Sequence, residues 1–236
     1  MRLNTLAWGS GPRTAVLIHG MLGSATQYHQ LGPALAERGY RVIALDLPGH
    51  GDSPPAPDAT MDLFVDAVVE SVDHEPALAI GHSLGAIVLS HSLSQLRPAR
   101  AVYVDVPLDS SRADPPPAGL RERFTTARAA RTESRLRATR PRWSAEDCRV
   151  EAEAAAKFDV DTAVALQHSY TAQTVPAPTI PSLVVRAEPS RYVSTERARE
   201  LEKMGFSVQA VRGAGHCVWY GFLDDFLGAL DEWVEA

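Results

Sequence analysis

The chain has 236 residues, of which 45% are hydrophobic and 22% charged, so it can bury the core of one domain, or of one domain with an insertion. Its net charge of -6 provides no basic field to attract nucleic acid or an anionic membrane. The two cysteines, Cys148 and Cys217, exclude a disulfide framework and lack metal-ligand spacing. No N-terminal signal core or membrane-spanning apolar run occurs. We therefore expect a cytoplasmic protein whose partner is a small molecule.

Apolar runs of strand length alternate with segments of helical periodicity along most of the chain. Strands are predicted at residues 15–18, 41–45, 77–80, 101–105, 183–186 and 207–211. Helices are predicted at residues 24–38, 61–72, 84–96 and 220–234. This alternation predicts the α/β class, with a mostly parallel sheet and helices on both faces.

The alternation breaks between residues 107 and 181. A proline-rich stretch at residues 114–117 leads into a segment rich in Arg, Ala and Glu with a largely helical pattern, and residues 176–178 (Pro-Ala-Pro) mark its end. We expect a small helical insertion above the carboxyl edge of the sheet, where open α/β sheets bind ligands. The predicted core is therefore residues 1–106 and 182–236, with residues 107–181 inserted between them.

A serine between two glycines follows the strand predicted at residues 77–80. The sequence of residues 81–85, GHSLG, fits the G-x-S-x-G pattern of a sharp strand-to-helix turn that strains and exposes its central residue, Ser83. Alone the pattern is weak, because serines often form turns and helix caps. A serine hydroxyl also needs a base to take its proton, and His216 on the glycine-containing loop after the last predicted strand is the candidate.

Anionic reaction intermediates need two preplaced hydrogen-bond donors. The backbone N–H of Leu84, directly after Ser83, is one candidate. The backbone N–H of Met21, which follows a glycine turn at the end of an early strand, is the other. His82 adjoins Ser83, but the alternation of side chains along a strand turns it away from the site and into packing.

Four segments in order resemble the α/β-hydrolase family over nearly the whole chain. They are residues 19–20 (HG), residues 46–53 (DLPGHGDS), residues 81–85 (GHSLG) and residues 215–216 (GH). The resemblance implies that Ser83 is the nucleophile, that His216 is the base, that Met21 and Leu84 donate to the oxyanion, and that residues 107–181 form a cap. Phosphate-loop and zinc-peptidase motifs do not occur, so we expect no cofactor and no metal.

One turn departs from the family pattern. Most members carry an aspartate after the penultimate strand, at the position of Ser190, but this turn reads Ala-Glu-Pro-Ser. Serine cannot supply the negative charge that orients the imidazole of the base. Asp105, at the end of a strand that some members use for their acid, is the predicted replacement. Glu188 is the alternative, and a site without an acid is the third option.

Substrate contacts are predicted from arginines and aromatic residues. Arg121, Arg128 and Arg135 recur every two helical turns, so they share a helix face that is either solvated or, through Arg128, collects an anionic substrate. Three aromatic residues are candidates for pocket walls, with core packing as the equal alternative: Tyr28, Trp143 and Trp219.

These features predict a serine hydrolase that cleaves an ester, thioester or lactone of a small metabolite through an acyl-Ser83 intermediate. A cofactor-free lyase or C–C hydrolase is one alternative, because the same site serves several reactions. A receptor-like protein with weak turnover is another, and the altered turn at Ser190 is its main support.

Overall fold

The computed structural model describes residues 1–109, 118–170 and 175–235. The proline-rich stretch expected at residues 114–117 lies outside these ranges. Within them, a seven-stranded sheet has the order β1-β3-β2-β4-β5-β6-β7. The strands are β1 (Thr5–Trp8), β2 (Arg13–Ile18), β3 (Tyr40–Leu45), β4 (Leu78–His82), β5 (Ala101–Val104), β6 (Ser182–Glu188) and β7 (Ser207–Arg212).

The sheet is mostly parallel, as the alternation predicted. Strand β1 is antiparallel to β3, and the other neighbouring pairs are parallel. All residues of β4 and β5 are buried, which is why these strands read as continuous apolar runs. Sequence reasoning missed β1, whose four residues lie at the sheet edge and alternate between exposed and half-buried, so they form no apolar run.

Helices cover both faces of the sheet, which confirms the predicted architecture. On one face, α2 (Met61–Ser71), α3 (Leu84–Leu96) and α8 (Thr195–Lys203) share a hydrophobic cluster with the strands. On the other face, the 3-10 helix η1 (Ala25–Tyr28), α1 (Leu31–Glu37) and α9 (Leu223–Glu235) share a second cluster. The helix predicted at residues 24–38 is therefore two shorter pieces, and α8 was not predicted.

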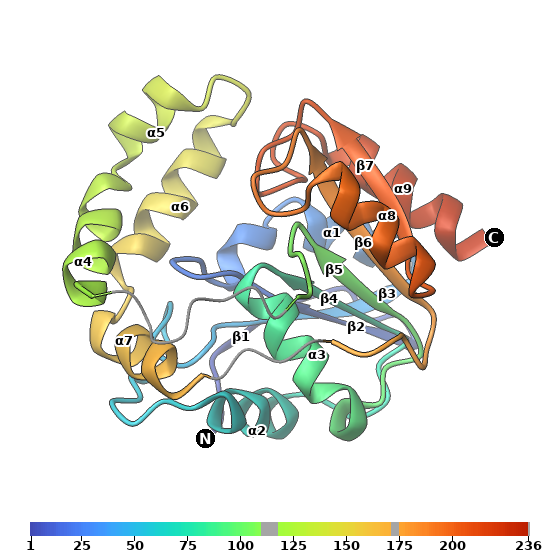
Figure 1. Cartoon of the computed structure of the whole chain (residues 1–236), viewed down its shortest axis with the longest axis horizontal. Coiled ribbons are helices and arrows are strands. Elements are labelled where there is room, and N and C mark those ends of the chain that lie inside the picture. Colours follow the sequence, from blue (N-terminus) through green and yellow to red (C-terminus); the bar gives the residue numbers. More distant parts are fainter. Residues whose placement is uncertain (110–117, 171–174, 236) are drawn as a thin grey trace.

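A helical insertion between β5 and β6 is present as predicted. It contains α4 (Leu120–Ala130), α5 (Glu133–Thr139), α6 (Ala145–Ala156) and α7 (Val160–Ser169), which gather on one side of the sheet, apart from α8 and α9 (Figure 1). The start of α6 is fixed by a capping box between Ser144 and Asp147. Phe158, Val160 and Ala163 of the insertion form a small apolar cluster with Leu22, which follows β2. The exact boundaries at residues 107 and 181 stay a prediction.

No helix in the described ranges has the length and apolar character required to cross a membrane.

Candidate active site

Ser83 lies in the strand-to-helix turn between β4 and α3. Its φ of 51° and ψ of -115° are strained for a residue other than glycine. A Cβ atom on Gly81 would lie 2.5 Å from the carbonyl oxygen of Gly85, and one on Gly85 would overlap the carbonyl oxygen of Ile18. The two glycines therefore allow the helix to pass close to the sheet, and the turn holds the Ser83 side chain at the sheet edge.

Ser83 opens into a cavity of about 530 Å³ at this edge. Most of the lining is apolar and comes from the turn after β2, from α3 and from the cap helices α4 and α7. The lining residues are Met21, Leu22, Ser83, Leu84, Ile87, Leu120, Arg123, Phe124, Ala127, Gln167 and Tyr192. Sequence reasoning missed Arg123, because it grouped the arginines of α4 by their seven-residue spacing, to which Arg123 does not belong.

Asp105 and His216 form a hydrogen-bonded pair near the same edge. Asp105 directly follows β5, and its side chain is only 1% exposed. His216 Nδ1 donates to Asp105 Oδ2 at 2.8 Å. Since Nδ1 carries the proton in this arrangement, Nε2 of the neutral ring is the nitrogen that can accept one. The Asp105 Oδ1 atom accepts two further hydrogen bonds, from Ser190 Oγ at 2.6 Å and from the Ala187 N–H at 3.1 Å.

Ser190, at the position where the resemblance places an aspartate, contacts the acid instead of replacing it. Its hydroxyl donates to Asp105 and accepts from the backbone N–H groups of Tyr192 and Val193, both at 2.9 Å. The hydroxyl thus connects the turn after β6 to the carboxylate after β5. Sequence reasoning treated Ser190 only as the loss of an acid and did not predict this contact.

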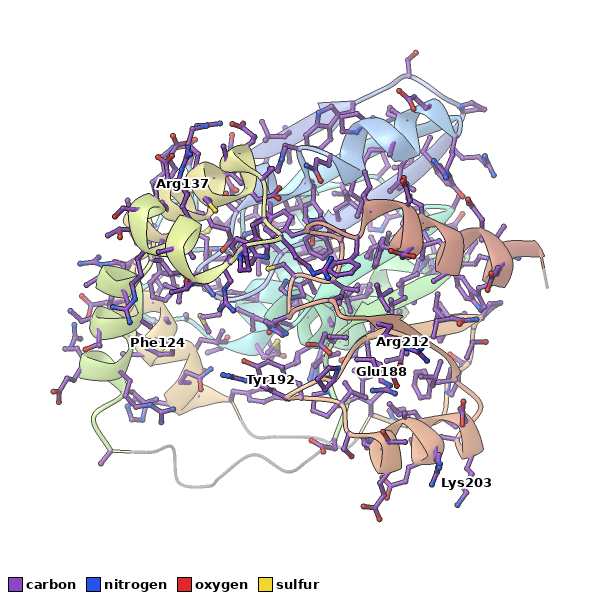
Figure 2. The ribbon with its side chains drawn as sticks, turned by 90° about the horizontal axis from the view of Figure 1, so that it is seen from above. Phe124, Arg137, Glu188, Tyr192, Lys203 and Arg212 are labelled. Carbon is purple, nitrogen blue, oxygen red and sulfur yellow. The ribbon has the colours of Figure 1, made fainter. Side chains whose placement is uncertain are left out.

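Glu188 does not contact His216. Its Oε1 atom accepts from Arg186 at 2.8 Å, and its Oε2 atom lies 3.7 Å from Arg212 Nε. Glu188 and Arg212 lie side by side, whereas Tyr192 points toward the cap (Figure 2). The Glu188 side chain is 38% exposed, and it forms a partly buried ion pair with Arg186, whose side chain is 8% exposed.

The two predicted oxyanion donors, Met21 and Leu84, flank Ser83 in the cavity. Leu84 is the first residue of α3, and the first N–H groups of a helix have no partner within it. A Cβ atom on Gly20 would lie 3.0 Å from Ser83 Cβ, so the turn that carries Met21 packs directly against Ser83. This places backbone N–H groups from two segments next to one side chain.

His82 and Tyr192 contact His216 from two directions. His82 is buried, and its Nε2 donates to the backbone carbonyl of His216 at 2.9 Å. Burial lowers the pKa of His82 well below 6.5, so the ring is neutral and packs 4.5 Å from the His216 ring, centroid to centroid. The Tyr192 ring lies 4.2 Å from the His216 ring. The expectation that His82 packs agrees with its burial, whereas Tyr192 was not predicted.

Two of the aromatic candidates lie in the core. Tyr28 and Trp219 are 0% exposed and stack with centroids 5.2 Å apart, and Trp219 Nε1 donates to the Gln27 carbonyl at 3.1 Å. A substrate cannot reach side chains without exposed surface, so the structure agrees with core packing for both. Trp143 lines a second cavity beyond His216 and not the one at Ser83.

The predicted arginine face contacts the neighbouring cap helix. Arg128 donates to the carbonyl of Phe158 at 3.2 Å, just before α7, and Arg121 forms an ion pair with Asp161 on α7. Arg135 lies on α5, beyond the end of α4, so the prediction that the three arginines share one helix face is wrong. Arg128 is therefore not part of the lining at Ser83, and its hydrogen bond joins α4 to the start of α7. Among the described residues, no cluster of His, Cys, Asp or Glu suited to a metal ion occurs.

Curated relatives match parts of the chain. Lipase LipV of Mycobacterium tuberculosis is 38% identical over 111 residues, which cover 44% of this chain and 41% of that protein. Pimeloyl-[acyl-carrier protein] methyl ester esterase of Methylococcus capsulatus is 42% identical over 80 residues, which cover 34% of this chain and 30% of that protein. The chain thus spans less than half the length of these relatives.

Solved structures match nearly the whole chain. N-formylmaleamic acid deformylase from Pseudomonas putida superposes with a TM-score of 0.76 at 23% identity, covering 96% of this chain and 94% of that one. An esterase from Exiguobacterium antarcticum has a TM-score of 0.72 at 15% identity, covering 99% and 96%. At these identities the likeness establishes the fold. Residues 15–227 match the Alpha/beta hydrolase family, so the chain belongs to this family, as its motifs predicted.

Proposed function

We propose that the chain is a serine esterase that hydrolyses an ester, thioester or lactone of a small metabolite through an acyl-Ser83 intermediate. The observation that carries the proposal is the Asp105 carboxylate, which is buried and accepts a hydrogen bond from His216 Nδ1 at 2.8 Å. This contact leaves Nε2 of His216 to act as the base for a serine held in a strained turn.

The reaction proceeds in two halves. Ser83 Oγ attacks the carbonyl carbon while His216 Nε2 takes its proton, and the N–H groups of Met21 and Leu84 donate to the developing oxyanion. His216 then gives the proton to the leaving oxygen or sulfur, and the acyl group stays on Ser83. A water molecule, deprotonated by His216, releases the acid and restores the serine. Asp105 stabilises the positive charge that His216 carries in both halves.

The lining of the cavity supports a small acyl group as substrate. A volume of about 530 Å³ lies within the usual range for small-molecule sites, and most of the lining is apolar. Two relatives are named as a lipase and a methyl ester esterase, which favours ester hydrolysis over C–C cleavage. The altered turn no longer favours a receptor-like protein, because Ser190 donates to an acid on the neighbouring strand.

A fluorophosphonate probe tests the proposal directly. The protein should be labelled once, and Ser83→Ala should abolish the labelling. Ser90→Ala is the matched control, since Ser90 lies on the same helix and its hydroxyl donates to the Ile87 carbonyl at 2.7 Å. Hydrolysis of para-nitrophenyl esters of increasing acyl length should disappear in the same variant. Labelling of another residue, or hydrolysis that survives in Ser83→Ala, would contradict the assignment.

A further inference from the structure

A second cavity, of about 320 Å³, lies beyond His216 and does not include Ser83. Its walls come from Arg131 between α4 and α5, from the end of α5 and the loop to α6, and from the loop between β7 and α9. His216 lines this cavity, and Tyr192, which lines the Ser83 cavity, packs on the His216 ring. His216 therefore borders the second cavity and is separated from the Ser83 cavity by the Tyr192 ring.

Three arginines line this second cavity, and two of them carry unneutralised charge. Arg131 pairs at 2.9 Å with Glu151, whose side chain is fully buried. The Arg140 guanidinium lies 5.5 Å from the centre of the Trp143 ring, and the Arg142 guanidinium lies 5.1 Å from the centre of the Phe222 ring. In the part of the chain that the structure describes, neither Arg140 nor Arg142 forms an ion pair with a carboxylate.

The two loops that carry these groups are packed tightly together. Gly221 has a φ of 74°, and a Cβ atom on it would lie 2.5 Å from the carbonyl oxygen of Arg142. Only glycine therefore allows the arginine-bearing loop to approach this closely. Arg140 and Arg142 are exposed, so an anion can reach their guanidinium groups, and the aromatic rings beside them favour positions over the cavity.

The net charge of the lining identifies the anion. The charges of Arg131 and Glu151 cancel, so Arg140 and Arg142 contribute two positive charges to the lining. A phosphate monoester carries a charge of about -1.5 to -2 at neutral pH. A carboxylate would neutralise only one of the two. Each guanidinium can also donate two parallel hydrogen bonds to phosphate oxygens. The cavity is thus matched to a phosphate group more closely than to a carboxylate.

Resting on the proposed esterase function, we infer that this cavity binds a phosphate group on the leaving alcohol or thiol of the substrate. His216 must hand its proton to the leaving oxygen or sulfur, so that group departs on the side of the imidazole. The acyl group then occupies the largely apolar cavity at Ser83. The bond between acyl carbon and leaving group breaks, the proton lost by Ser83 goes to the leaving group, and the phosphate does not react.

Calorimetric titration of the whole protein with inorganic phosphate and with phenyl phosphate tests the cavity without any turnover. Saturable binding is expected, and the double variant Arg140→Gln/Arg142→Gln should weaken it roughly tenfold or more, because hydrogen bonds between charged partners are lost. Arg137→Gln is the matched control: Arg137 is an exposed arginine of α5 that pairs with Glu133 and does not line the cavity (Figure 2). No saturable binding, or an equal loss in the control, overturns the inference.

Hydrolysis then tests which end of the substrate carries the phosphate. The double variant should lower kcat/KM for para-acetoxyphenyl phosphate roughly tenfold or more and change that for phenyl acetate less than about twofold. A loss confined to phenyl hemisuccinate, whose charge lies on the acyl side, overturns the placement. Fluorophosphonate labelling separates the two proposals. If the native protein binds phosphate through these arginines but is not labelled, the esterase function is contradicted and the anion-binding site is supported.

Discussion

Strands β5 and β6 are neighbours in the sheet, and a carboxylate lies at the carboxyl end of each: Asp105 directly follows β5, and Glu188 is the last residue of β6. Asp105 is 1% exposed and accepts three hydrogen bonds, one of them from His216. Glu188 is 38% exposed, and its partners are two arginines. Glu188 lies two residues before the position where the family pattern expects an acid, whereas Asp105 lies 85 residues before it, so proximity along the chain alone would favour Glu188. Their burial and their partners favour Asp105.

The difference teaches what an orienting acid needs. Two donors hold one oxygen of Asp105, from Ser190 and from the Ala187 backbone, so the other oxygen is aimed at His216. Such a carboxylate is fixed before the reaction starts, which is the condition for stabilising charge without reorganisation. The Glu188 carboxylate contacts Arg186 and Arg212 and not the imidazole of His216. Four predictions at Asp105, Ser190 and Glu188 sharpen the comparison.

Replacing the buried acid should have the largest effect. Asp105→Asn keeps the shape of the side chain but removes its charge and can favour the wrong tautomer of His216. In serine proteases the same change lowers kcat about 10⁴-fold. The backbone should tolerate the change, because φ at this position is 48° and asparagine adopts this left-handed region readily. Steady-state kinetics measure the loss, and thermal unfolding shows that the variant is folded. A folded Asp105→Asn variant with near-native kcat would show that Asp105 does not orient His216.

Moving the acid to the neighbouring turn should restore part of that loss. Ser190 Oγ lies 2.6 Å from Asp105 Oδ1, so a carboxylate at position 190 comes close to the same imidazole. In the Asp105→Asn background, adding Ser190→Asp should raise kcat roughly tenfold or more over the single variant, because a negative charge again faces His216. Adding Ser190→Asn is the control, since it has similar shape and no charge. Equal activity of the two double variants would show that only position 105 can orient the base.

Loss of the Ser190 hydroxyl should have a smaller effect. Ser190→Ala removes one of three donors to Asp105, and hydrogen bonds to charged groups contribute about 1.5–3 kcal/mol, so kcat should fall roughly 10- to 100-fold. KM should hardly change, because Ser190 does not line the cavity at Ser83. Ser190→Thr retains the hydroxyl and should restore kcat. A rise in KM with unchanged kcat would mean that the residue only shapes the loop.

Much of the fold was predictable because its signals are local. Buried parallel strands are apolar runs, and the G-x-S-x-G spacing marks the one turn where a helix must pass close to the sheet at Gly85. Strand β1 was not predicted, because an edge strand with exposed residues forms no apolar run. The helices of the insertion were expected only as a group, since their ends depend on caps such as Ser144.

The site was only partly predictable because its remaining contacts are long-range. The sequence gives no sign that Tyr192 packs on His216, or that the Ser190 hydroxyl reaches a carboxylate 85 residues away. The seven-residue spacing of the arginines predicted a shared helix face but not what that face contacts. In the structure, Arg128 donates to the carbonyl of Phe158, just before α7. Tyr28 and Trp219 show the same limit, because residue type alone does not distinguish an aromatic residue that packs in the core from one that lines a pocket.

Replacing the exposed carboxylate should have the smallest effect. Glu188→Gln removes a charge that faces Arg186 and Arg212 and no atom of His216, so kcat should stay within about twofold of the native value. Glutamine retains an oxygen that can accept from Arg186, but the Arg186 side chain is only 8% exposed and loses a charged partner, so the midpoint of thermal unfolding should fall while kcat is retained. The same kinetic assay as for Asp105→Asn measures both variants side by side. If Glu188→Gln is folded but inactive while Asp105→Asn is active, the orienting acid is Glu188 at the end of β6, and the burial of Asp105 serves the fold alone.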